Sequence, residues 1–339
     1  MRSARLAMVL LVATIGCSGL VARGANDNPA PPAAQKATQA ANDVPPWKGV
    51  NSGIATIPGI ERGVLIQSRG AAWRKLRPPV VLGGGVLLAF SVAALVSFYL
   101  WRGPIGVSAA PTGRLIERFS VADRVAHWTM GLSFVVLALT GLILAAGRRL
   151  LLPLVGYEFF SSIALACKNI HAFLGPLFML SLAYFIARYF RDNFPRRHDL
   201  DWLRLFGGMF SRKHVPSGRF NAGEKTLFWG LVCGFSVVLC ASGLILDFPN
   251  FAQGRALMQD ATIIHLAIAF LAIAASLFHM YLGTVGVKGA YRGMRDGTVD
   301  ESWAREHHEI WYDEVKAGRS RQHWVAPSAP LVAVPANDD

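Results

Sequence analysis

Long apolar blocks separated by short polar segments dominate the chain after residue 79. A membrane hydrocarbon core about 30 Å thick needs roughly 20 consecutive apolar residues in a helix. Five stretches have about this length and contain no Asp, Glu, Lys or Arg, namely 80–101, 125–147, 169–187, 226–246 and 261–287. Charged residues make up only 16% of the chain, which excludes an ordinary soluble domain. The pattern predicts an all-α membrane protein.

The first 79 residues have the composition of a leader followed by a tether. Two arginines precede an apolar run at 6–15, and small residues follow. This layout predicts a cleavable signal peptide over 1–24, with an uncleaved anchor as the alternative because no sharp small-x-small site is present. The segment 25–79 is predicted to be periplasmic. It begins as a flexible stretch rich in Ala, Pro, Asn and Gln, and we expect a small ordered cap that ends at Pro78 and Pro79.

The net charge of +13 is concentrated in short loops beside the apolar stretches, so lipid headgroups explain it more economically than nucleic acid. The loop 188–225 holds nine Lys or Arg, and the segment after 287 begins with three basic residues, whereas the loop 247–260 holds one. Positive-inside placement therefore predicts a cytoplasmic tail over 288–339 and a multi-pass protein of a bacterial inner membrane. A basic cluster at 74–77 opposes this orientation and is outvoted by the other loops.

Four of the nine histidines lie inside the predicted spans: His127, His171, His265 and His279. Ionisable side chains in a bilayer are costly and usually functional. A single membrane histidine is also compatible with a hydrogen-bonded core residue, but four together favour a function.

The depths of these histidines predict two pairs. His127 and His279 lie toward the predicted cytoplasmic side, and His171 and His265 toward the outer side. His265 and His279 are 14 residues apart, which returns to within about 40° of the same helix face and separates them by about 21 Å. Two bis-histidine haems satisfy this arrangement, with His127 paired to His279 and His171 paired to His265.

Other metal centres fit the sequence less well. Zinc and copper need ligands gathered around one ion, whereas these histidines separate into pairs. No Cys-x-x-Cys-His motif for covalent haem is present, and the four cysteines lack iron–sulfur spacing. Cys233 and Cys240 are expected to pack rather than to form a disulfide. Several glycines near the histidines either leave room for a porphyrin or let helices pack closely: Gly131, Gly141, Gly175, Gly234 and Gly243.

An ordered set of motifs then makes the chain resemble one family. The segment 117–144 reads ERFSVADRVAHWTMGLSFVVLALTGLIL. The further motifs, in order, are HAFLGP, FNAGEK, SGLIL, IHLAIAF, HMYLGTVGVKGAYRGMRDGTV and the tail segment SWAREHHEIWYDEV. Over 114–316 the chain is similar to the gamma subunits of respiratory formate dehydrogenases, which are dihaem cytochromes b. The resemblance implies a four-helix cytochrome b bundle over 114–287, preceded by an extra transmembrane helix over 80–101.

The resemblance also implies functional residues and partners. His127, His171, His265 and His279 would be the axial ligands of two b-type haems, and a quinone would bind on the cytoplasmic side near Asn221, Gly223, Glu224 and His279. Electrons would come from an iron–sulfur beta subunit and a molybdenum or tungsten alpha subunit, in a complex repeated around a trimer axis. A loop entering a helix offers free N–H groups to a quinone carbonyl. Asn221 and Glu224 are equally compatible with a helix-capping box.

Two other functions remain open from the sequence. One is a related dihaem cytochrome b that serves a hydrogenase or another molybdoenzyme, and the other is a transporter with histidine proton relays. No site for formate chemistry is visible, so that reaction is assigned to partner subunits. The remaining histidines lie in polar segments and are expected to be solvated or to contact partners: His198, His214, His307, His308 and His323.

Overall fold

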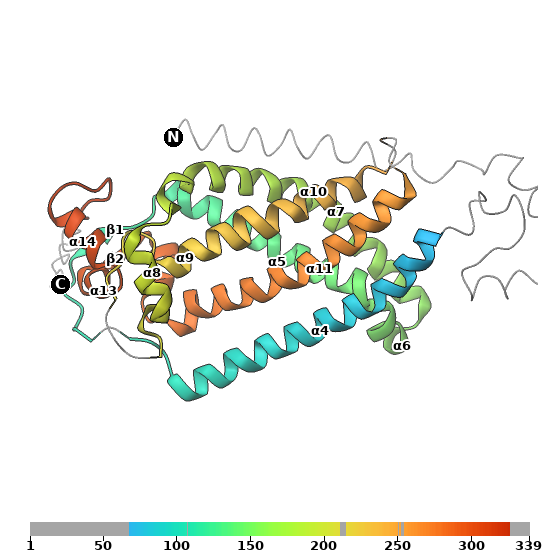
Figure 1. Cartoon of the computed structure of the whole chain (residues 1–339), viewed down its shortest axis with the longest axis horizontal. Coiled ribbons are helices and arrows are strands. Elements are labelled where there is room, and N and C mark those ends of the chain that lie inside the picture. Colours follow the sequence, from blue (N-terminus) through green and yellow to red (C-terminus); the bar gives the residue numbers. More distant parts are fainter. Residues whose placement is uncertain (1–67, 107, 211–214, 250, 252–253, 326–339) are drawn as a thin grey trace, which may run out of the picture. The chain divides into compact units, whose positions relative to one another are not determined.

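The computed structural model describes residues 68–106, 108–210, 215–249, 251 and 254–325 (Figure 1). The predicted signal peptide at 1–24, most of the segment 25–79 and the end of the tail lie outside these described residues.

Five helices among the described residues are long and apolar enough to cross a membrane (Figure 1). They are α4 (Ser68–Arg102), α5 (Val121–Leu150), α7 (Tyr157–Tyr189), the continuous run of α9 (Ala222–Leu227), the π-helix η3 (Phe228–Phe235) and α10 (Ser236–Asp247), and α11 (Arg255–Tyr281), which continues into the π-helix η4 (Leu282–Gly286). The predicted all-α membrane fold, with four spans and one extra amino-terminal span, is confirmed.

All five spans begin earlier than the apolar pattern predicted, and two of them, α4 and α7, begin twelve residues earlier. Helix α4 begins at Ser68, so Pro78 and Pro79 lie inside it rather than at the end of a separate cap. The two prolines remove two backbone donors, a loss that water or headgroups can compensate near the polar end of a span. Helix α7 begins at Tyr157 instead of residue 169, because it continues through Lys168 and other residues that a charge-free pattern excludes.

The spans keep little of their apolar surface inside the molecule. Only 6% to 22% of the positions in the most apolar window of each span are buried. On α4, Leu82, Phe90 and Leu100 are among the most exposed apolar side chains. Such a surface is stable only against lipid or further protein, as expected for a membrane helix.

The chain divides into two compact units, each of which contains parts of the long helices. The first unit comprises the described residues within Met1–Phe90, Thr129–Leu182 and Gly234–Ala274, together with the short helix α6 (Leu152–Val155). Its helices approach closely: Gly84 of α4 lies so near the Phe270 ring of α11 that a Cβ there would collide with it. Phe134 of α5 contacts Phe178 of α7, with ring centroids 5.9 Å apart.

The second unit comprises Ser91–Trp128, Ala183–Cys233 and the described residues from Ala275 onward. Besides its parts of the spans it holds short elements: β1 (Leu115–Glu117), η1 (Arg191–Asn193), α8 (Arg197–Arg204), η2 (Phe206–Gly208), α12 (Ala290–Arg295), β2 (Thr298–Asp300), α13 (Glu301–His307) and α14 (Glu309–Lys316). Strands β1 and β2 pair antiparallel, with Ile116 opposite Val299.

The two strands, α13, α14 and residues up to 325 form what we call the tail cap (Figure 1). Its core consists of buried apolar residues from both strands and both helices: Ile116, Val299, Trp303, Ala304, Trp311 and Val315. Ile116 also bridges to Trp324. The segment that precedes α5 is thereby fixed to the segment that follows α12, and the described part of the predicted tail, 288–325, is a folded part of the second unit.

The described cysteines, Cys167, Cys233 and Cys240, are free. Cys233 and Cys240 lie on successive helical elements, η3 and α10. The expectation that these two cysteines do not form a disulfide is therefore confirmed.

Candidate functional site

In the first unit, His171 of α7 and His265 of α11 face one another. Their ring centroids are 6.2 Å apart and the ring planes are inclined by 70°. Two imidazole nitrogens on opposite sides of one metal ion, each at about 2 Å from it, would lie about 4 Å apart, and this ring spacing leaves room for that arrangement. The two rings that were paired by depth are therefore neighbours, while their role as ligands stays a prediction.

Each of these histidines has a hydroxyl partner on a second helix. Thr140 Oγ1 lies 2.9 Å from His171 Nδ1, and Ser242 Oγ lies 2.9 Å from His265 Nδ1. Thr140 also donates to the Val136 carbonyl at 2.8 Å, as expected for a hydroxyl inside a helix. Because the hydroxyl proton is used in that bond, the oxygen is free to accept the Nδ1 proton. The lone pair of each Nε2 is then available for a metal.

A glycine follows each hydroxyl in the sequence and lies beside the same imidazole. A Cβ at Gly141 would lie 3.2 Å from Cε1 of His171, and one at Gly243 would lie 3.5 Å from Cε1 of His265. Gly131 and Gly175 would meet nothing within 4 Å among the described residues. Gly141 thus keeps a side chain away from the His171 ring, while the choice between room for a porphyrin and close helix packing stays a prediction.

In the second unit, His127 of α5 and His279 of α11 form the other pair. Their ring centroids are 6.0 Å apart, with an interplanar angle of 61°. The His127 ring also contacts Trp128 at 5.4 Å and Phe185 at 6.4 Å. Within the described part of the chain, the buried Nδ1 of His127 has no hydrogen-bond partner. This pair therefore has aromatic neighbours where the first pair has hydroxyls.

Each pair offers two ligands and no more. The described residues contain no group of three or more His, Cys, Asp or Glu side chains that could hold a metal ion. Zinc sites in proteins normally use three or four protein ligands. Two facing imidazoles instead fit an iron whose other ligands come from a porphyrin, as in cytochromes with two axial protein ligands. The donor set and the space left by the glycines thus fit haem.

The predicted quinone loop is a capping box at the start of α9. Asn221 Oδ1 accepts from the Glu224 backbone N–H at 2.9 Å, and the Asn221 N–H donates to Glu224 Oε2 at 2.8 Å. Gly223 is tightly enclosed, since a Cβ there would lie 2.7 Å from the Trp202 ring. In the part of the chain that the structure describes, no hydrogen bond, ion pair or ring contact joins this loop to His279. The capping interpretation is therefore confirmed, and the quinone assignment stays a prediction.

Glu224 is also held by a buried arginine that the sequence interpretation left unassigned. Arg118 Nη2 donates to Glu224 Oε1 at 3.0 Å, and the Arg118 side chain is only 3% exposed. Its guanidinium carbon lies 5.0 Å and 5.5 Å from the ring centroids of Trp303 and Trp311 in the tail cap. Burial lowers the pKa of Arg118 from its ordinary value, and Glu224 opposes that shift. The Glu224 carboxylate is thus committed to an ion pair as well as to the capping box.

A second ion pair links the loop to α8. Lys225 Nζ lies 2.7 Å from Asp199 Oδ2, and both side chains are buried. A buried charge left without its partner is strongly destabilising, so this pair fixes α9 to α8. The position of the loop is therefore held by ion pairs on both sides.

The prediction for His308 was wrong, because its polar neighbours in the sequence indicated a solvated side chain or a partner contact. His308 is buried, with Nδ1 2.8 Å from the Gly218 carbonyl oxygen, and its ring contacts Trp303 at 5.2 Å. Its neighbours in the sequence are polar because the short helix α14 is amphipathic, and the tail cap encloses its inner side. His323 has a largely exposed side chain, as expected. His214 lies outside the described residues.

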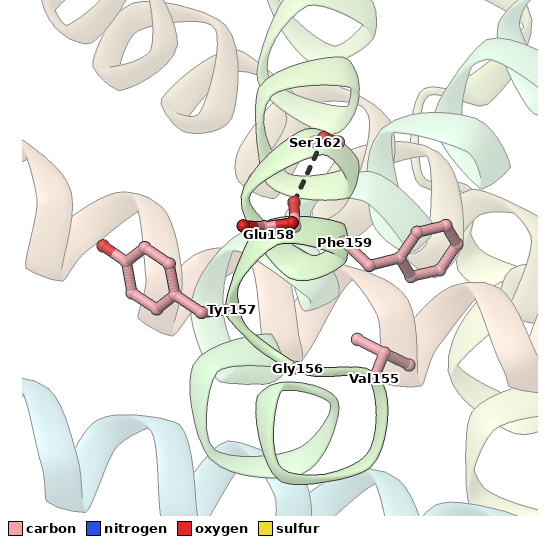
Figure 2. Close-up of a pocket in the computed structure, with 6 residues that line it drawn as sticks. All are labelled: Val155, Gly156, Tyr157, Glu158, Phe159 and Ser162. Carbon is pink, nitrogen blue, oxygen red and sulfur yellow. Dashed lines mark hydrogen bonds between the residues drawn. The ribbon is translucent and has the colours of Figure 1, made fainter.

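A pocket of about 540 Å³ lies between α6 and α7 in the first unit (Figure 2). Its lining comes from one continuous stretch that includes Gly156, Tyr157 and Glu158, and Ser162 Oγ donates to the Glu158 carbonyl at 3.1 Å (Figure 2). None of the four span histidines lines it. The pocket is thus separate from the candidate site.

Comparison with known proteins agrees with these features. The family described as prokaryotic cytochrome b561 matches residues 118–296. The cytochrome b556(Fdn) subunit of the nitrate-inducible formate dehydrogenase of Escherichia coli is 29% identical over 216 residues, which cover 62% of this chain and 95% of the relative. The cytochrome b556 subunit of a formate dehydrogenase of Haemophilus influenzae is 28% identical over 204 residues. These residues cover 59% of this chain and 83% of the relative.

These relatives confirm the resemblance that the motifs predicted, and the matched family region contains all four span histidines. The chain is an integral membrane cytochrome of the b type, and it belongs to the prokaryotic cytochrome b561 family.

Proposed function

We propose that this chain is the membrane electron-transfer subunit of a respiratory formate dehydrogenase, carrying electrons from an iron–sulfur partner through two b haems to quinone. The observation that carries the proposal is the presence of two histidine pairs, each with rings about 6 Å apart and each completed by α11. The names of the curated relatives support the choice of formate as the ultimate donor.

The haems, when bound, would accept and release single electrons at the two pairs. The chain supplies the axial imidazoles, orients His171 and His265 through Thr140 and Ser242, and leaves room at Gly141 and Gly243. The apolar spans, set in lipid, would keep water away from the ligands. We assign formate oxidation to a molybdenum or tungsten partner subunit, because this chain contains no predicted site for that chemistry.

For the acceptor side, we propose that quinone binds near His279 and the Asn221 loop and takes its protons from the cytoplasm. The basic segments support this orientation, with the tail cap in the cytoplasm and the amino-terminal segment in the periplasm. Glu224 is paired with Arg118, so we assign it to holding the loop and not to proton donation. The complex is expected to repeat around a trimer axis in the bacterial inner membrane.

The test is haem content in the full chain, purified from membranes that also contain its partners. The parental protein should hold two low-spin b haems per chain. His265→Ala should remove one and His279→Ala the other, because each supplies an axial ligand to a different iron. His323→Ala, at a largely exposed position, is the matched control and should keep both. If His265→Ala retains two low-spin haems, the pairing is wrong.

The donor can be tested in the same membranes. Formate should reduce both haems, whereas dihydrogen should leave them oxidised. Reduction by dihydrogen instead of formate would favour the alternative, in which a related dihaem cytochrome b serves a hydrogenase.

A further inference from the structure

The two histidine pairs differ in what holds their Nδ1 atoms. His171 and His265 each lie 2.9 Å from a hydroxyl oxygen, on α5 and α10 respectively. The Nδ1 of His127 is buried without a partner in the described structure. The His279 side chain makes no hydrogen bond with another described residue. The hydroxyl contact therefore distinguishes the first pair from the second.

The direction of these hydrogen bonds follows from the protons available. Thr140 Oγ1 lies 2.8 Å from the Val136 carbonyl, and Ser242 Oγ lies 2.7 Å from the Val238 carbonyl. A carbonyl oxygen can only accept, so each hydroxyl proton points to its own helix. Each hydroxyl oxygen can then accept the Nδ1 proton, for which the Leu137 and Leu239 carbonyls are further acceptors, and either acceptor fixes the tautomer with a free Nε2.

The same device occurs twice with different residues. Thr140-Gly141 on α5 serves His171, and Ser242-Gly243 on α10 serves His265. In each dipeptide the hydroxyl holds Nδ1, while the glycine leaves space beside Cε1. Repetition on two different helices, α5 and α10, within the similar segments TGLIL and SGLIL, indicates a requirement of the imidazoles and not a peculiarity of one helix contact.

We propose that Thr140 and Ser242 are positioning residues that lower the reduction potential of the haem held by His171 and His265; this inference rests on the proposed function. An imidazole whose Nδ1–H is accepted by another group is a more basic ligand. A more basic ligand stabilises the ferric state, which carries the greater positive charge. The hydroxyls would thus favour release of the electron from a haem held by this pair, whereas no described residue offers a hydroxyl contact of this kind to His127 or His279.

The experiment is a redox titration of the full chain in its membrane complex. Thr140→Val and Ser242→Ala remove the hydroxyls, and Thr140→Ser and Ser242→Thr retain them. In the first two variants we expect one of the two haem midpoints to move to a more positive potential while the other stays in place. The hydroxyl-retaining variants should titrate like the parental protein.

Ser133→Ala provides a matched control on α5. Ser133 is buried and donates to the Thr129 carbonyl at 2.7 Å, as Thr140 does to Val136, but no histidine contact of its hydroxyl is present among the described residues. Removing this hydroxyl should leave both potentials unchanged. A shift as large as that of Thr140→Val would show that loss of any buried hydroxyl has the same effect, and would overturn the proposal.

The outcomes separate this inference from the function on which it rests. A parental protein without two b haems would refute the proposed function. With both haems present, unchanged midpoints in Thr140→Val and Ser242→Ala, or an equal shift in Thr140→Ser, would refute the role of the hydroxyls alone. Loss of one haem in Thr140→Val with retention in Thr140→Ser would support it, because partners of this kind contribute to metal affinity. Loss of one haem in both Thr140→Val and Thr140→Ser would refute the role of the hydroxyls.

Discussion

The membrane spans and the tail cap differ in how far protein encloses their polar side chains. In the spans most positions remain uncovered by protein, and the histidines are held by a few contacts at single atoms. In the tail cap, His308 is enclosed by tryptophan rings and an apolar core, and Arg118, directly after β1, packs against the same tryptophans. The stability of the cap depends on burial, whereas ligand binding in the spans depends on a few atoms. Mutations in the cap should therefore change its stability without changing ligand binding in the spans, and the reverse should also hold.

The largest effect is expected from removing the centre of the tail cap. Trp311 is completely buried, and truncation of such a side chain costs about 3–5 kcal/mol through lost burial and the cavity that remains. Trp311→Ala should therefore expose the segment around Arg305 to trypsin. The measurement is limited proteolysis of the membrane-bound protein, followed over time by gel electrophoresis.

Trp101→Ala is the control for this prediction, because Trp101 lies on α4 and is 67% exposed. It should leave the cleavage rate of the tail unchanged. Haem absorption should survive in Trp311→Ala at the pair His171 and His265, which belongs to the first unit. Equal cleavage in the parental protein and Trp311→Ala would mean that the cap does not depend on this core.

A smaller effect on stability, but a specific effect on function, is expected at the loop before α9. Asn221→Ala removes the side chain that accepts from the Glu224 N–H, which costs about 0.5–2 kcal/mol for an N-cap. If the Asn221 amide also contacts quinone, turnover of quinone by formate should fall several-fold with both haems still bound and reducible. The measurement is steady-state haem reduction recorded together with quinone turnover.

Asn221→Ser separates the two roles of this residue, since serine caps a helix about as well as asparagine but lacks the amide. We expect Asn221→Ser to lose turnover as Asn221→Ala does. Parental turnover in Asn221→Ser, with loss only in the alanine variant, would mean that the loop is only a helix cap and that quinone binds elsewhere.

The spans could be predicted from the sequence because a membrane helix needs one local property, a long apolar run. Their ends could not be placed as well, since α7 extends through Lys168 where the local pattern already reads as polar. The histidine pairs were accessible from depth alone, because ionisable residues are rare in apolar stretches. Thr140 and Ser242 carried no such signal, as hydroxyl residues are common in membrane helices and bond to their own backbone.

The tail cap shows what a single sequence does not reveal. Ile116 pairs with Val299, and their separation along the chain leaves no local pattern that links them. Arg118 lies within a motif that identified the family, yet its partners Glu224, Trp303 and Trp311 come from distant segments. His308 was misplaced for the same reason, because its burial depends on packing by residues that are remote in the sequence.

The smallest expected effect is a change in the stability of the tail cap with pH. Burial holds the pKa of His308 well below its ordinary value of 6.5, and the positive charge of Arg118 adds to this shift. The unfolded chain therefore binds a proton at this residue as the pH falls below about 6.5, while the folded cap does not. Stability is present above that pH and is lost as the pH falls, with a slope of at most about 1.4 kcal/mol per pH unit.

Asp300 acts in the same direction but in a more acidic range. Burial raises the pKa of this carboxyl, but hydrogen bonds from Ser302, Thr112 and Gly113 outweigh burial and hold the pKa below 3.8. Its stabilisation is present above the unfolded pKa of 3.8 and is lost only as the pH falls through the lowered folded pKa. Between about pH 6.5 and pH 4.5, Asp300 therefore contributes little to the pH dependence, whereas His308 contributes to it.

Limited proteolysis of the tail between pH 7.5 and pH 5, with a protease active across this range, should show faster cleavage at the acidic end. His308→Gln cannot gain a proton, so its cleavage rate should vary less with pH, even if the variant is less stable throughout. His323→Gln removes a largely exposed imidazole whose Nδ1 lies 3.4 Å from Glu117 Oε2, and because such surface contacts contribute little, it should keep most of the parental pH dependence. A parental cleavage rate independent of pH, or an unchanged profile in His308→Gln, would mean that His308 does not couple cap stability to protonation.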